Sequence, residues 1–299
     1  MKILVTGKNG QLGSELQKTC PSNVELICFG SKELDISNAE QVNELLITYS
    51  PDIVINAAAY TAVDKAETDS DTAYAVNKFG AANLANTCKH INARLIHIST
   101  DFVFDGTSTM PYTASDATNP LGVYGASKLA GEQAINEILG SQATIVRTAW
   151  VYSFFGNNFV KTMLRLMAEK EQLGIVGDQV GTPTWAAGLA NMLWALVAKA
   201  SSEQVLNTEN TATILNWTDA GVASWYDFAV AIQELAIEQG LLTKSIPISA
   251  IPAASYPTPA KRPAFSVLNK AQAEEISGVK TVHWRTQLKE MLTELKLNQ

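Results

Sequence analysis

The chain has 299 residues, of which 46% are hydrophobic and 17% charged, and its net charge is −7. This is the composition of a folded globular protein, long enough for one large α/β domain or two smaller ones. The acidic balance, without any basic run, excludes a nucleic-acid or anionic-membrane partner. Three cysteines, an odd number without a C-x-x-C pair, favour a reduced cytoplasmic protein. Three scattered histidines argue against a zinc enzyme.

The first half of the chain alternates short apolar runs with segments of helical composition. The apolar runs predict buried parallel strands at 2–7, 24–30, 52–58, 93–100 and 143–150. The segments between them predict helices at 11–20, 38–49, 68–90 and 124–140. This alternation indicates βαβ units and an α/β fold with a doubly wound, Rossmann-like parallel sheet. Because the first strand follows Met1-Lys2 directly, we expect no signal peptide.

The pattern changes after about residue 150. We expect a loop and a helix over 152–170, a strand and a Gly/Pro-rich loop over 173–184, a helix over 184–200, a strand over 203–207, a helix over 224–240 and a last helix over 283–296. The apolar segment 186–200 is too short to cross a bilayer. Ser224 predicts an N-cap with Asp227 three residues on, and Gly240 predicts the end of that helix. The proline-rich segment 251–266 predicts an irregular loop.

We therefore expect two parts. A dinucleotide-binding domain would span 1–150 plus about 184–210. A smaller C-terminal substrate lobe would span about 151–183 plus 211–299.

A glycine-rich turn follows the first strand. Gly7, Gly10 and Gly13 form G-x-x-G-x-x-G, a variant of the dinucleotide fingerprint, at the start of a helix whose N-terminus suits a pyrophosphate. The second strand ends without the acid that commonly binds a ribose 2′-hydroxyl. Ser31 and Lys32 stand there instead, which favours a 2′-phosphate and NADP(H); the alternative is that Lys32 is an ordinary solvated lysine.

Two tyrosines precede a lysine by four residues. Tyr74 and Lys78 lie within a pattern typical of a structural helix, whereas Tyr124 and Lys128 begin a helix shortly after a strand that ends in Ser99 and Thr100. The carboxyl ends of parallel strands line the ligand crevice, so we expect Ser99, Thr100, Tyr124 and Lys128 to meet there.

This second group suits the reduction of a ketone by a nicotinamide. The developing alkoxide needs a proton, and a nearby ammonium would lower the pKa of the phenol that supplies it. The hydroxyl of Thr100 would hydrogen-bond the carbonyl.

By these residues the chain resembles the extended short-chain dehydrogenase/reductases. The resemblance runs over nearly the whole chain. Its motifs are GKNGQLG (7–13), PDIVINAAAYTAVDKAE (51–67), STDFVFDG (99–106), NPLGVYGASKLAGE (119–132), RTAWVYS (147–153), GNNFVKTMLRL (156–166), DQVGTPT (178–184) and YPTPAKRP (256–263).

The resemblance implies that NADPH, or alternatively NADH, reduces the 4-keto group of dTDP-6-deoxy-L-lyxo-4-hexulose in dTDP-rhamnose biosynthesis. It implies Tyr124 as proton donor, Lys128 as its partner and ribose ligand, and Thr100 at the keto group. It places Gly10, Gln11 and Leu12 at the pyrophosphate, Asp35 and Ile36 by the adenine, and Ala58, Ala59 and Tyr60 along the cofactor. It places Val63, Asp101, Phe102 and Trp150 at the sugar and Arg262 at the nucleotide end; the alternatives are core packing for Trp150 and a surface ion pair for Arg262.

Two positions depart from the family pattern. Tyrosine is common where this chain has Phe102, so one substrate hydrogen bond is missing or replaced. Some members dimerise around Mg²⁺ held by glutamates; Glu15 and Glu294 fit two of the places, but the segment 184–191 has alanine at a third. The resemblance leaves the chain a monomer or a homodimer.

Two rival functions remain at this point. A sugar-nucleotide epimerase or 4,6-dehydratase shares the fold, but a dehydratase usually has Thr-Asp-Glu where this chain has Thr100-Asp101-Phe102, and phenylalanine cannot transfer protons. A non-catalytic regulatory subunit also shares the fold, but Thr100, Tyr124 and Lys128 are intact here.

Overall fold

The computed structural model describes residues 1–200 and 210–298. Its centre is a parallel six-stranded sheet in the order β10-β5-β4-β3-β1-β2. The strands are β1 (Lys2–Thr6), β2 (Glu25–Phe29), β3 (Ile53–Asn56), β4 (Arg94–Thr100), β5 (Ala143–Thr148) and β10 (Thr213–Asn216). The order reverses between β1 and β3, which is the point where doubly wound sheets bind their ligands. The predicted fold class is confirmed.

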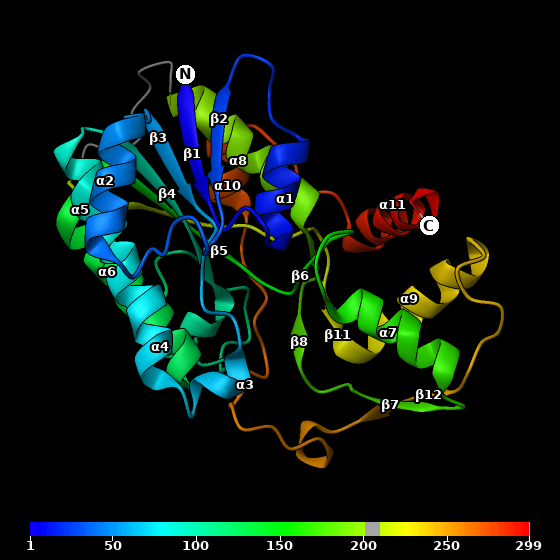
Figure 1. The fold of residues 1–299 in the computed structure, drawn as a ribbon. Coiled ribbons are helices and arrows are strands. Elements are labelled where there is room, and N and C mark those ends of the chain that lie inside the picture. The colour runs from blue at the N-terminus through cyan, green and yellow to red at the C-terminus, as the bar shows by residue number, and fades with distance from the viewer. Residues whose placement is uncertain (201–209, 299) are drawn as a thin grey trace.

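Helices cover both faces of the sheet (Figure 1). Side chains that alternate along the strands point to opposite faces, so each face has its own apolar core. One core joins the sheet to α1 (Gln11–Lys18), α8 (Ala186–Ala200) and α10 (Ala271–Ser277). The other joins it to α2 (Ala39–Tyr49), α5 (Ala81–His90) and α6 (Val123–Leu139).

The five strands predicted in the first half are confirmed, with ends shifted by two residues at most. The strand predicted at 203–207 lies outside the described residues. The edge strand β10 was not predicted, because four residues with a single Ile-Leu pair give little apolar signal.

The single helix predicted over 68–90 is three segments. α4 (Ser70–Tyr74) passes into a π-helical turn, η1 (Ala75–Gly80), and then into α5, while a short helix α3 (Val63–Ala66) precedes them. The side chain of Asn77, in the π-turn, donates to the carbonyl of Tyr60 at 3.1 Å and accepts from its N–H at 2.9 Å. The turn is thereby tied to the segment that follows β3.

The second half adds a smaller lobe with its own apolar core, seen at the right of Figure 1. Its elements are β6 (Val151–Tyr152), α7 (Phe159–Glu169), β7 (Leu173–Val176), β8 (Val180–Gly181), β9 (Thr184–Trp185), β11 (Ala223–Ser224), α9 (Trp225–Glu238), β12 (Ile248–Ile251) and α11 (Trp284–Leu297). The predicted start of α9 is confirmed, because Ser224 and Asp227 form a capping box. Gly240, just beyond the helix, has a φ of +73°.

The expected boundary of the smaller lobe needs a correction. β10 pairs with β5 and α10 packs against α8, so both lie with the sheet although they were expected in the lobe. The reason is that the chain crosses back to the sheet twice. The rest of the expected division stays a proposal.

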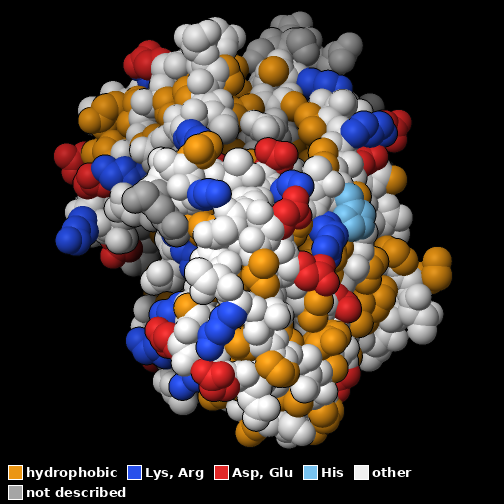
Figure 2. Space-filling view, turned by 90° about the vertical axis from the view of Figure 1, so that its right-hand side faces the viewer, with side chains coloured by type: hydrophobic (Ala, Val, Ile, Leu, Met, Phe, Trp, Pro, Cys, Tyr) orange, Lys and Arg blue, Asp and Glu red, His pale blue; other side chains and the backbone are white. Residues whose placement is uncertain are grey.

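The face on the side of the smaller lobe carries Lys and Arg side chains interspersed with Asp and Glu, with apolar side chains between them (Figure 2). Ion pairs between α11 and α9 contribute to this mixture, such as Lys289 with Glu238 at 2.7 Å. This face therefore has no continuous basic surface of the kind that binds nucleic acid. Among the described residues, no helix has the length and apolar character needed to span a membrane.

Candidate active site

A cleft of about 850 Å³ opens at the carboxyl ends of β1, β3, β4 and β5 and extends to the first residues of the smaller lobe. Most residues predicted for the site line it. They are Gly7, Gly10, Gln11, Leu12, Ser31, Asp35, Ile36, Ala58, Ala59, Tyr60, Val63, Thr100, Asp101, Phe102, Tyr124, Lys128 and Trp150. Residues from distant parts of the chain therefore meet in one place.

The glycine-rich turn shapes one end of the cleft. Gly7 has a φ of +73°, and a Cβ there would lie 2.8 Å from the backbone of Ala57. Gly13 does not line the cleft; it lets α1 pack on the turn, since a Cβ would lie 2.2 Å from the carbonyl oxygen of Gly7. Gly10 is the N-cap of α1, so Gln11 and Leu12 belong to its first turn, where backbone N–H groups lack intrahelical partners. The turn thus presents N–H donors and the positive end of a helix to the cleft.

The three predicted catalytic side chains come from two elements. Thr100 is the last residue of β4, while Tyr124 and Lys128 lie in the first two turns of α6. The hydroxyl of Thr100 donates to Oδ1 of Asp101 at 3.1 Å, and its interaction with the phenol of Tyr124 lowers the pKa of that phenol. A carbonyl oxygen in this part of the cleft would meet both hydroxyl groups.

Burial raises the pKa of Tyr124 to about 12; the interaction with Thr100 opposes this shift and the charge of Asp101 adds to it. The expectation that Lys128 lowers this pKa is wrong, because Lys128 is not among the groups that shift it. The amine of Lys128 points to the carbonyl oxygen of Ile98 at 2.6 Å instead. Tyr124 therefore stays a protonated phenol at neutral pH, which is the form that can give up a proton.

Asp101 lies directly behind the reactive hydroxyl groups. Asp101 is 2% exposed, and burial raises its pKa to about 6, although the interactions with Ser266 and Thr100 oppose this shift. Phe102 contributes shape instead of a polar group. Its ring packs edge-on against Tyr124 with a centroid separation of 5.5 Å.

Trp150 lines the cleft and also packs against the core of the smaller lobe, which was the alternative to a role at the sugar. Its ring stacks on Trp225 of α9 with centroids 3.5 Å apart. Its φ of +49° is unusual for a large side chain, a backbone conformation that costs energy and must be held by its surroundings. Trp150 thus joins the end of the sheet to the smaller lobe at the wall of the cleft.

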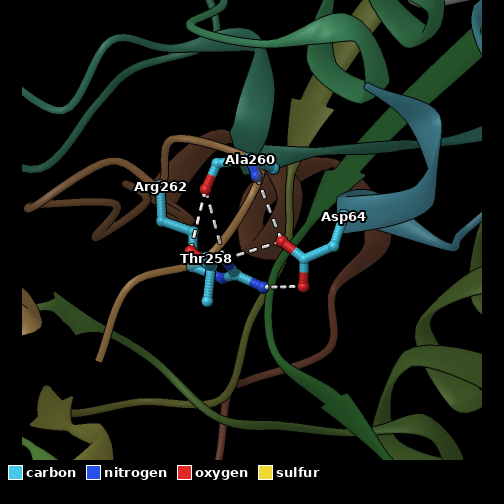
Figure 3. A network of polar contacts seen from close by, with 4 residues as sticks. All are labelled: Asp64, Thr258, Ala260 and Arg262. Carbon is cyan, nitrogen blue, oxygen red and sulfur yellow. Dashed lines mark hydrogen bonds and ion pairs between the residues drawn. The ribbon is translucent and has the colours of Figure 1, made fainter. Parts of the chain in front are cut away.

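Arg262 does not line the cleft, and in this structure it makes the ion pair considered as the alternative. Its guanidinium donates to both carboxylate oxygens of Asp64, at 3.1 and 2.8 Å (Figure 3). It also donates to the hydroxyl of Thr258 and to the carbonyl oxygen of Ala260. The hydrogen bonds from Arg262 lower the pKa of Asp64. Because Asp64 follows Val63 in α3, the pair fastens the proline-rich loop to the rim of the cleft.

Ser31 and Lys32, which were expected to bind a 2′-phosphate, differ in their position relative to the cleft. Ser31 lines the cleft, whereas Lys32 is exposed beside it and does not. The neighbouring Glu33 is paired with Lys8 and accepts from the N–H of Gly30 at 2.7 Å. The turn after β2 is thus held in shape by a carboxylate whose charge is balanced by a lysine.

Glu15 and Glu294, the expected ligands of a magnesium ion between two copies of the chain, both have partners within this chain. Glu15 is fully buried and accepts from Ser153 at 2.6 Å, and burial raises its pKa. Glu294 is paired with Lys18, which already supplies a cation. No group of three or more potential metal-ligating side chains occurs among the described residues. The magnesium site expected between two copies of the chain stays a prediction.

One wall of the cleft is formed by Gly156, Asn157 and Asn158, which begin a motif of the resemblance but received no role in the expected site. Asn158 caps α7 and donates to the side chain of Gln11 at 3.0 Å, so it links the smaller lobe to the glycine-rich turn. The available signal was an Asn immediately before an amphipathic helix, which predicts a cap but not a contact with a distant turn.

A parallel doubly wound sheet, a glycine-rich turn at the first helix and a Tyr-Lys pair beside a threonine define an oxidoreductase of the short-chain dehydrogenase/reductase class. The family model described as RmlD substrate binding domain matches residues 1–297, and the chain belongs to this family.

Curated relatives and solved structures agree with this assignment. The chain is 40% identical to a dTDP-4-dehydrorhamnose reductase of Escherichia coli (strain K12), covering 99% of this chain and 98% of the relative. A crystal structure of such a reductase from Clostridium acetobutylicum superposes with a TM-score of 0.90 at 41% identity, covering 99% of this chain and 100% of that one. A further such structure, from Bacillus anthracis in complex with NADP, has a TM-score of 0.89 at 34% identity, covering 98% and 99%.

Proposed function

We propose that this enzyme reduces the 4-keto group of dTDP-4-dehydro-L-rhamnose (dTDP-6-deoxy-L-lyxo-4-hexulose) with NADPH, giving dTDP-L-rhamnose in the last step of dTDP-rhamnose biosynthesis. The curated relatives that carry the name of this reductase support the substrate. The observation that carries the proposal is the meeting of Thr100, Tyr124 and Lys128 in the cleft that begins at the glycine-rich turn.

The residues present fit a dinucleotide. The turn at Gly7 and Gly10 leaves no side chain between the backbone and the cleft, and the first turn of α1 offers N–H groups to a pyrophosphate. We assign the adenine end to Asp35 and Ile36 and the middle of the cofactor to the segment 58–60, which lines the same cleft. When bound, NADPH supplies the hydride.

The protein supplies the proton and the orientation. We assign to Thr100 the hydrogen bond that fixes the keto oxygen and to Tyr124 the transfer of its phenolic proton to that oxygen as negative charge develops. An alkoxide is a stronger base than a phenolate, so transfer is downhill even from a phenol whose pKa is about 12. Lys128 as an ammonium favours the phenolate that remains.

We assign the sugar to the wall made by Val63, Phe102 and Trp150, and the nucleotide end to Arg262. Arginine suits bidentate contact with phosphate, but here its donors are engaged by Asp64. Nucleotide binding would therefore exchange a carboxylate partner for a phosphate at the rim of the cleft. The proposed enzyme is cytoplasmic and works as a monomer or homodimer.

Reduction is favoured over the rival reactions of the same fold. Solved UDP-glucose 4-epimerases superpose with TM-scores near 0.78 but are 17–18% identical, which is evidence for the fold alone. Phe102 stands beside Tyr124 where a dehydratase needs an acid or base. A regulatory subunit would have no need for a buried Lys128 next to a cleft-facing phenol.

Product analysis tests the proposed function. The enzyme is incubated with NADPH and the dTDP-4-keto sugar, and the products are separated and identified. We expect dTDP-L-rhamnose in a one-to-one ratio to the cofactor oxidised. An epimer formed without net oxidation of NADPH would indicate an epimerase, and cofactor binding without turnover would indicate a regulatory protein.

The preference for NADPH is tested by measuring kcat/KM with NADPH and NADH side by side, in the wild type and in Lys32→Ala. We expect NADPH to be preferred and the preference to change little in Lys32→Ala, because Lys32 lies outside the cleft. A Ser31→Ala variant should reduce the preference more. A strong preference of the wild type for NADH would reject a 2′-phosphate site at this turn.

A further inference from the structure

A row of buried polar side chains crosses the sheet beneath the cleft and ends at Lys128. Thr6 on β1, Asn56 on β3 and His97 on β4 are each at most 1% exposed, and these strands are neighbours in the sheet. The hydroxyl of Thr6 donates to Oδ1 of Asn56 at 2.6 Å. The amide nitrogen of Asn56 lies 2.9 Å from Nδ1 of His97, and Nε2 of His97 lies 3.2 Å from Nζ of Lys128.

The hydrogen bonds around Asn56 fix the orientation of its amide. Its oxygen accepts from the hydroxyl of Thr6 and from the backbone N–H of Ala58, which lies 3.2 Å away. In the reversed orientation the amide NH₂ would face the N–H of Ala58, and two donors would meet. The NH₂ group therefore faces Nδ1 of His97. That nitrogen is then an acceptor, and the proton of the neutral imidazole lies on Nε2.

This tautomer matters for Lys128. A protonated lysine has donors and no acceptor, so an ammonium would oppose its own N–H groups to the Nε2–H of His97. A neutral amine accepts from that Nε2–H and still donates to the carbonyl oxygen of Ile98. The contact thus favours the neutral amine. Burial acts in the same direction and lowers the pKa of Lys128 to about 8.

Other charged and titratable groups surround this contact. Glu132, one turn further along α6, raises the pKa of Lys128 but is itself paired with Arg147 of β5 at 2.7 Å. Burial and the charge of Lys128 lower the pKa of His97 well below its usual value, so the imidazole stays neutral. Titratable groups on α6 and on the elements packed against it also include Tyr124 on α6, Asp101 in the short helix Asp101–Val103, and Glu67, which accepts from the N–H of Val123.

We propose that His97, held in its Nε2–H tautomer by Asn56, sets the protonation equilibrium of Lys128 and thereby the pH range in which the enzyme is active. His97 acts through Lys128 and touches no substrate, so it is a positioning residue. An ordinary lysine stays charged far above neutral pH. With this partner, Lys128 is able to lose and regain a proton within the working range of the enzyme. Only the kinetic test below rests on the proposed function.

The tautomer is measured directly by NMR. The chain has three histidines, so two-bond ¹H–¹⁵N spectra of cofactor-free enzyme labelled with ¹⁵N-histidine contain few signals, and His97→Gln assigns the one in question. We expect the neutral Nε2–H form of His97, unchanged over the pH range around ~6.5 where free histidine titrates. In Asn56→Asp a carboxylate accepts from Nδ1, and the signal changes to the Nδ1–H form. An Nδ1–H tautomer or an imidazolium in the wild type would overturn the proposal.

The pH profile of kcat/KM measures the consequence. For the wild type we expect activity to fall above a pH of about 8, where Lys128 loses its proton. Asn56→Asp frees the lone pair of Nε2, and His97→Gln offers a carbonyl oxygen, so both variants accept from the ammonium. Each should move the alkaline fall upward by roughly one pH unit, which is tenfold in the ratio of the two protonation states.

A matched control for Asn56→Asp places a buried carboxylate at another asparagine of the same sheet. Asn216 of β10 is 1% exposed and donates to the carbonyl oxygen of Tyr112 at 2.8 Å, away from Lys128. Asn216→Asp should leave the alkaline fall unchanged, whereas an unchanged fall in Asn56→Asp and His97→Gln would overturn the proposal. If Asn56→Asp does not fold, His97→Gln decides. Absence of turnover in the wild type would reject the proposed function and leave the NMR result standing.

Discussion

The two Tyr-Lys pairs have the same spacing and different surroundings. Tyr124 and Lys128 lie on a regular helix whose first turns face the cleft, and Lys128 is 2% exposed. Tyr74 ends α4, and Lys78 lies in the π-helical turn that follows, with its amine 5.2 Å from the centre of the exposed ring of Phe79. Neither Tyr74 nor Lys78 is among the described residues that line the cleft.

The difference teaches that spacing brings a phenol and an amine to one side of a helix, while burial and partners decide their chemistry. A π-turn has a different residue period, so four residues along it do not lie directly above one another. The helices nevertheless touch, because Gly131 of α6 packs against the carbonyl of Asn77 in the π-turn. The helix that carries Tyr124 and Lys128 therefore packs against the π-turn that carries Lys78.

The largest expected effect separates the two tyrosines. Tyr124→Phe removes the proton donor and should lower kcat by ~10²–10⁴-fold while NADPH still binds. Tyr74→Phe should keep nearly full activity. Steady-state kinetics and a fluorescence titration with NADPH measure both variants. Equal activity in Tyr124→Phe and the wild type would remove the distinction between the pairs.

Loss of the Thr100 hydroxyl is expected to give the next largest fall in activity. Thr100→Val removes the donor to the keto oxygen and should lower kcat by ~10²-fold or more, as removal of an oxyanion donor does. Thr87→Val replaces another buried threonine, on α5, and controls for the loss of a hydroxyl inside the fold. A rise in KM with kcat unchanged would show that Thr100 binds the sugar without acting on the reacting oxygen.

The contact between α6 and the π-turn is expected to affect the stability of the fold. In Gly131→Ala the new Cβ would lie 2.2 Å from the carbonyl oxygen of Asn77, so α6 must move away from the π-turn. We expect a loss of stability of ~1–3 kcal/mol, the usual cost of overpacking. Denaturant unfolding measures it, with exposed Gln133→Ala on the same helix as control. A loss of unfolding free energy no larger than that of Gln133→Ala would mean that α6 can move away from the π-turn without cost.

The smallest effect concerns the ring that packs on Tyr124. Phe102→Tyr adds the hydroxyl that the resemblance led us to expect and should lower KM for the sugar nucleotide by ~2–10-fold, the value of one net hydrogen bond. Phe79→Tyr, beside Lys78, changes an exposed ring and should leave KM unaltered. An increase in KM for Phe102→Tyr would show that the cleft has no room or partner for the hydroxyl.

The local patterns in the sequence were sufficient for the parallel strands, the glycine-rich turn and the capped helix α9, because each depends on a few neighbouring residues. They were also sufficient to prefer Tyr124 over Tyr74, since a strand end with two hydroxyl groups precedes only the former. They failed where distant segments meet. The contact of Asn158 with Gln11 and the pair of Arg262 with Asp64 join residues more than a hundred positions apart.

The sequence by itself determined the class of fold, the order of the first five strands of the sheet along the chain and the residues proposed as reactive side chains. Only the tertiary structure decided their chemical state. The pKa of Tyr124 is raised, the pKa of Lys128 is lowered, and the amine faces His97, because the free energy of a charge depends on what surrounds it after folding. Residue types and spacing cannot report that environment.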